Sequence, residues 1–320
     1  MGHNRVLVGV LSAGEPSLES SLASIHAQEE VEVEIIHVAD RPQFEAHREL
    51  FAAFDERSAD FDLIVKVDAD MEIVNTRLFT ALIAMFQRFP EHDLIPVAVD
   101  DWLSRTRIWG LNAWRGGVRW TAPPPALFVD RVPSTVRSAM SLLDTGAPLV
   151  LHATRPTTAQ CLRYGAQRAL KASALGTKRP FRRLDAIVAQ AEAEPARERL
   201  LVLVAVERAL LDAEHGRQLI ESLPPPLLIE QAEEAVATAS AQQLIEAARA
   251  AIGTQRHLHG LTSAEPQSST TAPLPQVTPT GYQPPRTLVP VIRHLARAGR
   301  EGLLRRRTPE RIFAHYLRGA

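Results

Sequence analysis

The stretch "LIVKVDADMEIV" at residues 63–74 decides the fold, because it sets two carboxylates directly after a buried strand. Residues 63–67 are apolar except for Lys66, which is typical of a strand covered on both faces. An ionised carboxylate is costly to bury without a partner, so Asp68 and Asp70 require a compensating charge. Side chains two residues apart in an extended chain point the same way, so both can share one cation. Hard oxygen ligands favour Mg²⁺ or Mn²⁺.

Strand-like and helix-like segments alternate on both sides of this stretch. Apolar runs predict strands at 5–12, 31–39, 61–68 and 92–99. Amphipathic segments predict helices at 17–28, 43–57 and 76–88. The alternation predicts an α/β fold with a mostly parallel sheet and helices on its faces. Ligands of such sheets bind beyond the carboxyl ends of the strands, where this chain carries Ser12, Glu15, Asp40 and the two aspartates.

The chain changes character between residues 106 and 180. A strand, a turn and an irregular aromatic loop are expected over 106–132, a composition suited to a substrate lip. A helix is predicted at 133–143, then a short strand that ends at His152, then a helix at 157–175.

Four segments are predicted along the chain. They are an α/β domain over 1–180, a helical appendage over 181–262, a disordered Pro/Ser/Thr linker over 263–285 and a basic amphipathic helix or tail over 286–320. The tail holds nine Arg against two Glu, which leaves about −8 on the rest of the chain. This asymmetry indicates a separate task for the tail, and contact with an anionic membrane or a partner protein and a merely solvated end are both open.

Composition excludes several classes of protein. The chain is 45% hydrophobic with a net charge of −1, as in globular proteins, and no nucleic-acid partner is expected. One cysteine, Cys161, excludes an intrachain disulfide and a cysteine-rich zinc site, which fits a reducing compartment. The N-terminus reads as a first strand and not as a signal peptide, and no run of apolar residues is long enough to span a membrane. We therefore expect a cytoplasmic protein, and peripheral contact with a membrane through residues 286–320 is left open.

The order of these motifs resembles the nucleotide-sugar-dependent glycosyltransferases of the GT-A fold, particularly the family 2 type. The resemblance covers residues 4–175 and is carried by "RVLVGVLSAGEPSLESSLASIHAQ" at 5–28, a second strand that ends at Asp40, and "LIVKVDADM" at 63–71. The family's helix typically ends near "SI..Q", which corresponds here to Ser24, Ile25 and Gln28. Two departures, "SAGEP" in the first loop and "HVADRP" after the second strand, affect base recognition and not the fold.

The resemblance also assigns roles to residues. It implies contact with the donor nucleotide by the loop at Ser12 and Glu15 and by Asp40. It implies a cation that bridges the sugar diphosphate, held by Asp68 and Asp70, with His152 as a third metal or diphosphate contact. Arg163, Arg168 and Lys171, on the helix after His152, are candidates to screen a diphosphate or are simply a solvated face. Lys66, on the same strand face as Asp68, is expected to neutralise the carboxylates or touch the nucleotide.

The remaining assignments concern the acceptor. An inverting transfer needs a carboxylate base beyond the two aspartates, and Asp130 is the first candidate, with Asp100 and Asp101 as alternatives. Trp109 and Trp114 are candidate sugar platforms, since an aromatic face covers the apolar face of a pyranose.

The sequence therefore predicts a glycosyltransferase that uses Mn²⁺ or Mg²⁺ to move a sugar from a nucleoside-diphosphate sugar to a hydroxyl acceptor, with inversion. The alternatives are a non-catalytic nucleotide-sugar-binding or scaffold protein and a Mg²⁺-dependent phosphatase or phosphotransferase. The phosphatase alternative is disfavoured because Glu72 occupies the position where that class carries Thr or Val. A nucleotidyltransferase would show a basic glycine-rich first loop, which "LSAGEPS" lacks.

Overall fold

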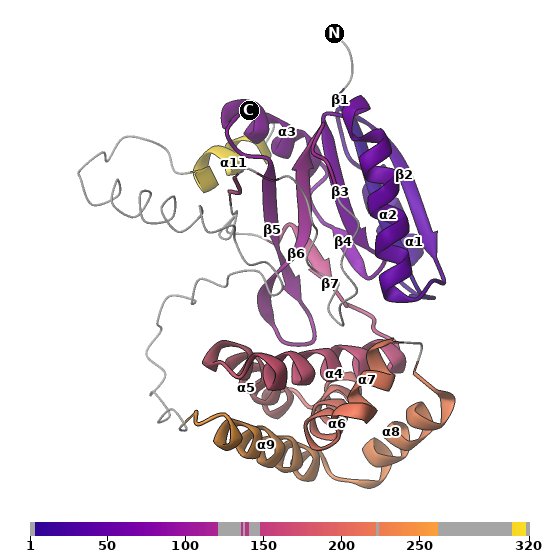
Figure 1. Ribbon diagram of the computed structural model, residues 1–320, viewed down its shortest axis with the longest axis vertical. Helices are drawn as coiled ribbons and strands as arrows, with labels where there is room; N and C mark the ends of the chain where they lie inside the picture. Colours follow the sequence, from indigo (N-terminus) through magenta and orange to yellow (C-terminus); the bar gives the residue numbers. More distant parts are fainter. Residues whose placement is uncertain are drawn as a thin grey trace, which may run out of the picture. The chain divides into compact units, whose positions relative to one another are not determined.

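The computed structural model describes residues 4–120, 136, 138–140, 148–221, 224–261 and 309–317 (Figure 1). These residues fall into two compact units. The first unit contains the chain up to Asp100, then Arg107–His152, and the C-terminal helix. The second contains Asp101–Thr106 and the residues from Ala153 to Pro275. The second unit therefore resumes at Ala153, whereas the predicted boundary lies at residue 180, and the helix predicted at 157–175 belongs to the second unit.

The first unit is built on a seven-stranded mixed sheet in the order β2-β1-β3-β6-β5-β7-β4. Its strands are β1 (Asn4–Ser12), β2 (Val31–Ala39), β3 (Leu63–Asp68), β4 (Met71–Ile73), β5 (Leu94–Asp101), β6 (Thr106–Arg115) and β7 (Val150–His152). Its helices are α1 (Leu18–His26), α2 (Gln43–Arg57), the short 3₁₀ helix η1 (Ser58–Asp60), α3 (Leu78–Arg88) and α11 (Pro309–Leu317). The predicted α/β fold class with flanking helices is confirmed for this unit, although the sheet is mixed and not mostly parallel, because β6 pairs antiparallel with β3 and β7 pairs antiparallel with β4.

Both faces of the central strands are buried, which explains their apolar sequence. In β1, Val6, Val8 and Val10 face the core shared with α1 and α3. Leu7 faces the opposite core, where Phe51 and the other apolar side chains of α2 pack. Because β1 pairs in parallel with both β2 and β3, the carboxyl ends of these three strands meet at one edge of the sheet.

A glycine after β6 lets two backbones approach closely. A Cβ atom on Gly116 would lie 1.7 Å from the carbonyl oxygen of Phe61, while the Gly116 N–H donates to Asp62 O at 3.1 Å. We expect Gly116→Ala to destabilise the protein by about 1–3 kcal/mol, because the main chain must shift to admit the methyl group. Thermal unfolding checks this against Gly253→Ala, a helical position with open space around it. A melting temperature lowered no more by Gly116→Ala than by Gly253→Ala would contradict it.

The C-terminal helix belongs to the core of the first unit. α11 packs against α3, beside which it lies in Figure 1. Phe313 is fully buried, and Ile312, Tyr316 and Leu317 pack against the same core. The apolar side chains of this part of the predicted tail are therefore covered by the protein's own first unit. The rest of the predicted tail, residues 286–308 and 318–320, and the predicted linker lie outside the described residues, so a membrane or partner contact through them stays a prediction.

The second unit is helical. It consists of α4 (Thr158–Leu175), α5 (Lys178–Ala193), α6 (Arg197–Leu211), α7 (Ala213–Glu221), α8 (Pro226–Thr238) and α9 (Ala241–Leu258). α4 begins with a capping box between Thr157 and Gln160 and ends at Gly176, whose φ of 54° suits a residue without a Cβ atom. Among the described residues, no helix combines the length and apolar character that a membrane-spanning segment needs.

The segment Asp101–Thr106 is fastened to the helices by a buried arginine. The guanidinium of Arg199 stacks over the Trp102 ring at 4.4 Å and forms an ion pair with Glu194 at 2.7 Å. It also donates to Trp102 O at 3.2 Å. Since Arg199 is fully buried, these contacts compensate a charge that would otherwise destabilise the unit.

Cys161 is buried in α4, and burial raises the pKa of its thiol to about 12. Because the thiolate is the reactive form, we expect the folded protein to react with a thiol reagent such as DTNB far more slowly than free cysteine does. One thiol per chain should appear at once when denaturant is added. Rapid labelling at pH 8 without denaturant would contradict the buried position.

Candidate active site

The first feature of the site is a polar rim at the carboxyl ends of β1, β2 and β3. Ser12 lies opposite Ala39 and Leu11 lies opposite Asp68 in the strand register. The backbone N–H of Asp40 donates to Ser12 O at 3.0 Å, and that of Ala69 donates to Leu11 O at 3.0 Å. The structure thus brings together three elements that are about thirty residues apart in sequence, as the parallel sheet predicts.

Asp68 is paired with a lysine of its own strand. Lys66 Nζ donates to Asp68 Oδ1 at 2.5 Å, and only 11% of the lysine side chain is exposed. Burial acts to raise the pKa of Asp68, but the charge and hydrogen bond of Lys66 outweigh it, so the pKa lies below its ordinary value. Lys66 therefore neutralises a carboxylate, one of the two roles expected for it, and Asp68 stays ionised.

Asp70 has a different environment, although it is only two residues away. It lies in the turn between β3 and β4, and its Oδ2 is 3.5 Å from Nε2 of His152. This approach follows from the antiparallel pairing of β4 with β7, in which Met71 is opposite His152. Burial raises the pKa of Asp70, the histidine lowers it in part, and the charge of Asp68 raises it further. Asp70 is therefore the carboxylate of the pair that gains more from a cation.

Contacts within the loop after β1, and one contact with β2, fix the conformation of this loop. Glu15 Oε2 accepts a hydrogen bond from the Ala13 N–H at 2.5 Å, and Gly14 has a φ of 81°, which favours glycine. Ser12 Oγ lies 2.7 Å from His37 Nε2 on β2. Asp40 has a φ of 55°, a conformation that aspartate tolerates better than most residues. Ser12, Glu15 and Asp40 therefore lie on or next to the rim, and their contact with a nucleotide stays a prediction.

Two histidines of the site were missed by the sequence analysis. His37 bonds to Ser12, and His47 on α2 is close enough to help lower the pKa of Asp68. His47 is buried and its Nδ1 lies 2.7 Å from Gln43 O. A signal for His47 was present, since it shares the apolar side of a helix with Leu50 and Phe54.

The tryptophans differ in what they can contact. Trp114 is 1% exposed and packs against Phe54 and Trp120 in the core, so its predicted sugar contact is wrong. Trp109 is only partly buried, and its indole nitrogen has no hydrogen-bond partner among the described residues. It lies three residues from Asn112, which pairs with Lys66, so it is near the same end of the sheet as Asp68. A sugar contact by Trp109 stays a prediction.

The three candidates for the base differ in what the structure describes of them. Asp130 lies outside the described residues. Asp100 is engaged by Arg107, whose Nε lies 2.9 Å from its Oδ1. Asp101, in the second unit, is buried and accepts hydrogen bonds from Ser104 and from the Tyr164 hydroxyl, the latter at 2.7 Å. The Asp101 carboxylate therefore already accepts two side-chain hydrogen bonds within the second unit. Asp130 remains the first candidate for the catalytic base.

The residues around Asp70 fit a divalent cation. Within the described ranges, no three His, Cys, Asp or Glu side chains come together closely enough to form a metal site by themselves. Mg²⁺, however, is usually held by one or two carboxylates, and water and substrate phosphates complete its shell. Asp70 and His152, with Asp68 beside them, supply oxygen and imidazole ligands of the kind that Mn²⁺ accepts.

Comparison with known proteins finds only solved structures of low sequence identity to this chain. No protein-family model and no curated protein matches the chain. TarS from S. aureus, residues 1–349, is 11% identical with a TM-score of 0.33, and the match covers 79% of this chain and 91% of that one. The mannosyltransferase PcManGT from Pyrobaculum calidifontis, in complex with GDP-Man and Mn²⁺, is 15% identical with a TM-score of 0.35 and coverages of 79% and 86%. A longer TarS chain is 10% identical with a TM-score of 0.32 and coverages of 80% and 54%. The contacts described above, and not these likenesses, support the function proposed next.

Proposed function

We propose that this protein is a divalent-cation-dependent glycosyltransferase that moves a sugar from a nucleoside-diphosphate sugar to a hydroxyl acceptor. The single observation that supports this most is the arrangement of the two aspartates at the end of β3. Asp68 is charge-balanced by Lys66, while Asp70, two residues on, faces His152 and carries a raised pKa. Carboxylates with perturbed pKa values and a partner within reach cluster at functional sites, which favours a cation at Asp70 over a purely structural pair.

Each residue of the candidate site has a separate proposed role in binding the cation and the donor. Asp70 and His152 would hold the cation, which when bound stabilises the departing nucleoside diphosphate. Lys66 keeps Asp68 ionised and oriented. Ser12 and Asp40 would contact the nucleoside, since they lie on the same rim.

The transfer itself needs a base. The acceptor oxygen forms a bond to the anomeric carbon while the bond from that carbon to the diphosphate oxygen breaks, and Asp130 takes the acceptor proton. Attack from the face opposite the leaving group inverts the anomeric configuration. Trp109 would cover the apolar face of the sugar.

A nucleotide panel tests the proposal. Thermal shifts are measured with UDP-, GDP-, dTDP- and CMP-sugars, each with and without Mn²⁺. We expect one nucleotide class to stabilise the protein only when the metal is present, by about 3 kcal/mol at a hundredfold excess over its Kd. Release of the free nucleotide from that donor, a diphosphate from UDP-, GDP- and dTDP-sugars and CMP from CMP-sugars, then separates an enzyme from a binding protein. No shift with any donor would contradict the proposal.

A further inference from the structure

The side of α1 that faces the D-x-D segment, residues 68–70 with β4 after it, is polar. Ser17, Ser21, Ser24 and Gln28 recur at helical spacing, so they lie on one side of α1 and the turn that follows it. Ser21 is fully buried and Gln28 is 7% exposed. An amphipathic helix normally presents apolar side chains to its neighbours. Apolar packing therefore does not explain these four residues, which we call the polar stripe.

The stripe bonds to the main chain of the D-x-D segment. Ser17 Oγ donates to Ala69 O at 3.1 Å, between the two aspartates. Ser24 Oγ accepts from the Ile73 N–H at 3.0 Å, and its own hydroxyl donates to Ser21 O at 2.7 Å. β4, whose other edge pairs with β7, is thereby fixed on the α1 side as well.

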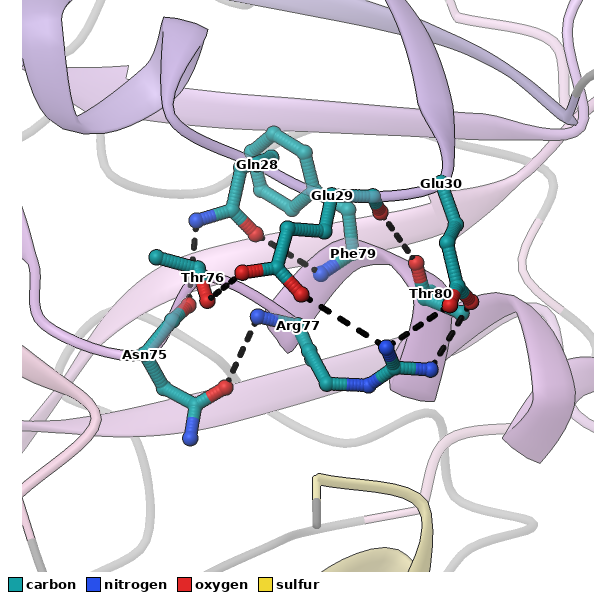
Figure 2. A network of polar contacts seen from close by, with 8 residues as sticks. All are labelled: Gln28, Glu29, Glu30, Asn75, Thr76, Arg77, Phe79 and Thr80. Carbon is teal, nitrogen blue, oxygen red and sulfur yellow. Dashed lines mark hydrogen bonds and ion pairs between the residues drawn. The ribbon is translucent and has the colours of Figure 1, made fainter. Parts of the chain in front are cut away.

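Gln28 extends the same contacts to the start of α3 (Figure 2). Its Nε2 donates to Asn75 O at 3.0 Å, and its Oε1 accepts from the Phe79 N–H at 3.1 Å. That N–H belongs to the first turn of α3, whose amides have no partner within the helix. In Figure 2, Glu29 reaches Thr76 and Arg77, and Glu30 also meets Arg77, so the connection to β2 is joined to the connection after β4.

We propose that Ser24 and Gln28 are positioning residues for the metal and diphosphate site. They act through the backbone of β4 and of the connection after it. The bond from the Ile73 N–H to Ser24 Oγ and the bond from Gln28 Nε2 to Asn75 O hold β4 where Asp70 faces His152. This inference rests on the proposed function for its ligand, but the contacts that carry it are independent of any ligand. Groups that orient a metal ligand affect metal affinity by about 10–100-fold when removed.

The test compares four variants, three on α1 and one in the turn that follows it. Ser24→Ala removes the acceptor for the Ile73 N–H, and Ser24→Thr restores it. Ile25→Val is the matched control, since Ile25 is buried on the same helix but makes only apolar contacts with the core. Gln28→Glu serves as a second variant if Ser24→Ala does not fold, because it keeps the acceptor for Phe79 N and loses the donor to Asn75 O.

Two measurements are made on each full-length variant. In hydrogen exchange without metal or nucleotide, Ser24→Ala should accelerate exchange at residues 69–75 about tenfold, while β1 amides stay unchanged. In Mn²⁺ titrations followed by EPR, it should weaken binding about tenfold, and Ser24→Thr should recover most of the loss. Changes no larger than those of Ile25→Val in both measurements would overturn the positioning role. If the wild type fails to bind Mn²⁺, the proposed function fails, and the exchange experiment still decides whether α1 holds the segment.

Discussion

Replacing Asp70 with Asn is expected to lower metal-dependent release of nucleoside diphosphate by about a hundredfold or more. The amide keeps the size of the side chain but removes the negative charge that holds the cation, and the loss of a group that stabilises developing charge costs about 10²–10³ in rate. The effect should be larger for Asp70 than for Lys66, since Lys66 only balances Asp68. Steady-state turnover with the donor found in the nucleotide panel, over a range of Mn²⁺ concentrations, measures it.

Asp62→Asn is the matched control for this experiment. Asp62 precedes β3 at the opposite end of the strand, where its Oδ2 accepts from the Arg5 N–H at 2.8 Å. The same carboxylate-to-amide change there keeps an acceptor and is far from the rim, so turnover should stay within about twofold of wild type. Equal losses in Asp62→Asn and Asp70→Asn would show that the charge change disturbs the strand and not a metal site.

Phe313→Ala is expected to lower the stability of the first unit by about 3–5 kcal/mol, the usual cost of removing a fully buried aromatic side chain. Phe313 is the residue of α11 buried deepest in the core shared with α3, so α11 should detach when it is lost. For a unit of this size the melting temperature should fall by about 6–20 °C. Differential scanning calorimetry, or urea unfolding followed by tryptophan fluorescence, measures the change.

His315→Ala provides the comparison on the same helix. His315 is partly exposed and makes a ring contact with Tyr316 at 6.0 Å, so its loss should cost less than about 1 kcal/mol. If Phe313→Ala were no more destabilising than His315→Ala, the helix would not be part of the core. That result would instead support the prediction from sequence that the C-terminal residues form a separate tail.

The part of the fold that local pattern determines was predictable. Each predicted helix from 17 to 88 appears within two residues of its expected ends, because amphipathic spacing and buried-strand composition are local signals. The position of β6 between β3 and β5, antiparallel to β3, was not predicted, since sheet order depends on contacts between distant residues. The same holds for Asp101–Thr106, which a buried arginine nearly a hundred residues away attaches to the second unit.

The candidate site was predictable where charge interrupts apolar sequence. Asp68 and Asp70 stand out for that reason, and the β4–β7 pairing that brings His152 to Asp70 is a long-range contact consistent with the expectation for that histidine. Trp114 was misassigned because composition cannot tell an aromatic residue in a lip from one in a core. Ser24 and Gln28 could be noticed in sequence, but their bonds to a segment fifty residues away could not.

The central claim is that Asp70 and His152, beside Asp68, hold a divalent cation to which a nucleoside diphosphate binds. A Mn²⁺ titration followed by EPR, in the presence and absence of UDP, GDP, dTDP and CMP, tests it most directly on the full-length wild type and Asp70→Asn. We predict binding of about one Mn²⁺ per chain that one nucleotide tightens and that Asp70→Asn weakens at least tenfold. Mn²⁺ binding that is absent, or that is equal in Asp70→Asn and wild type with every nucleotide, would contradict the account.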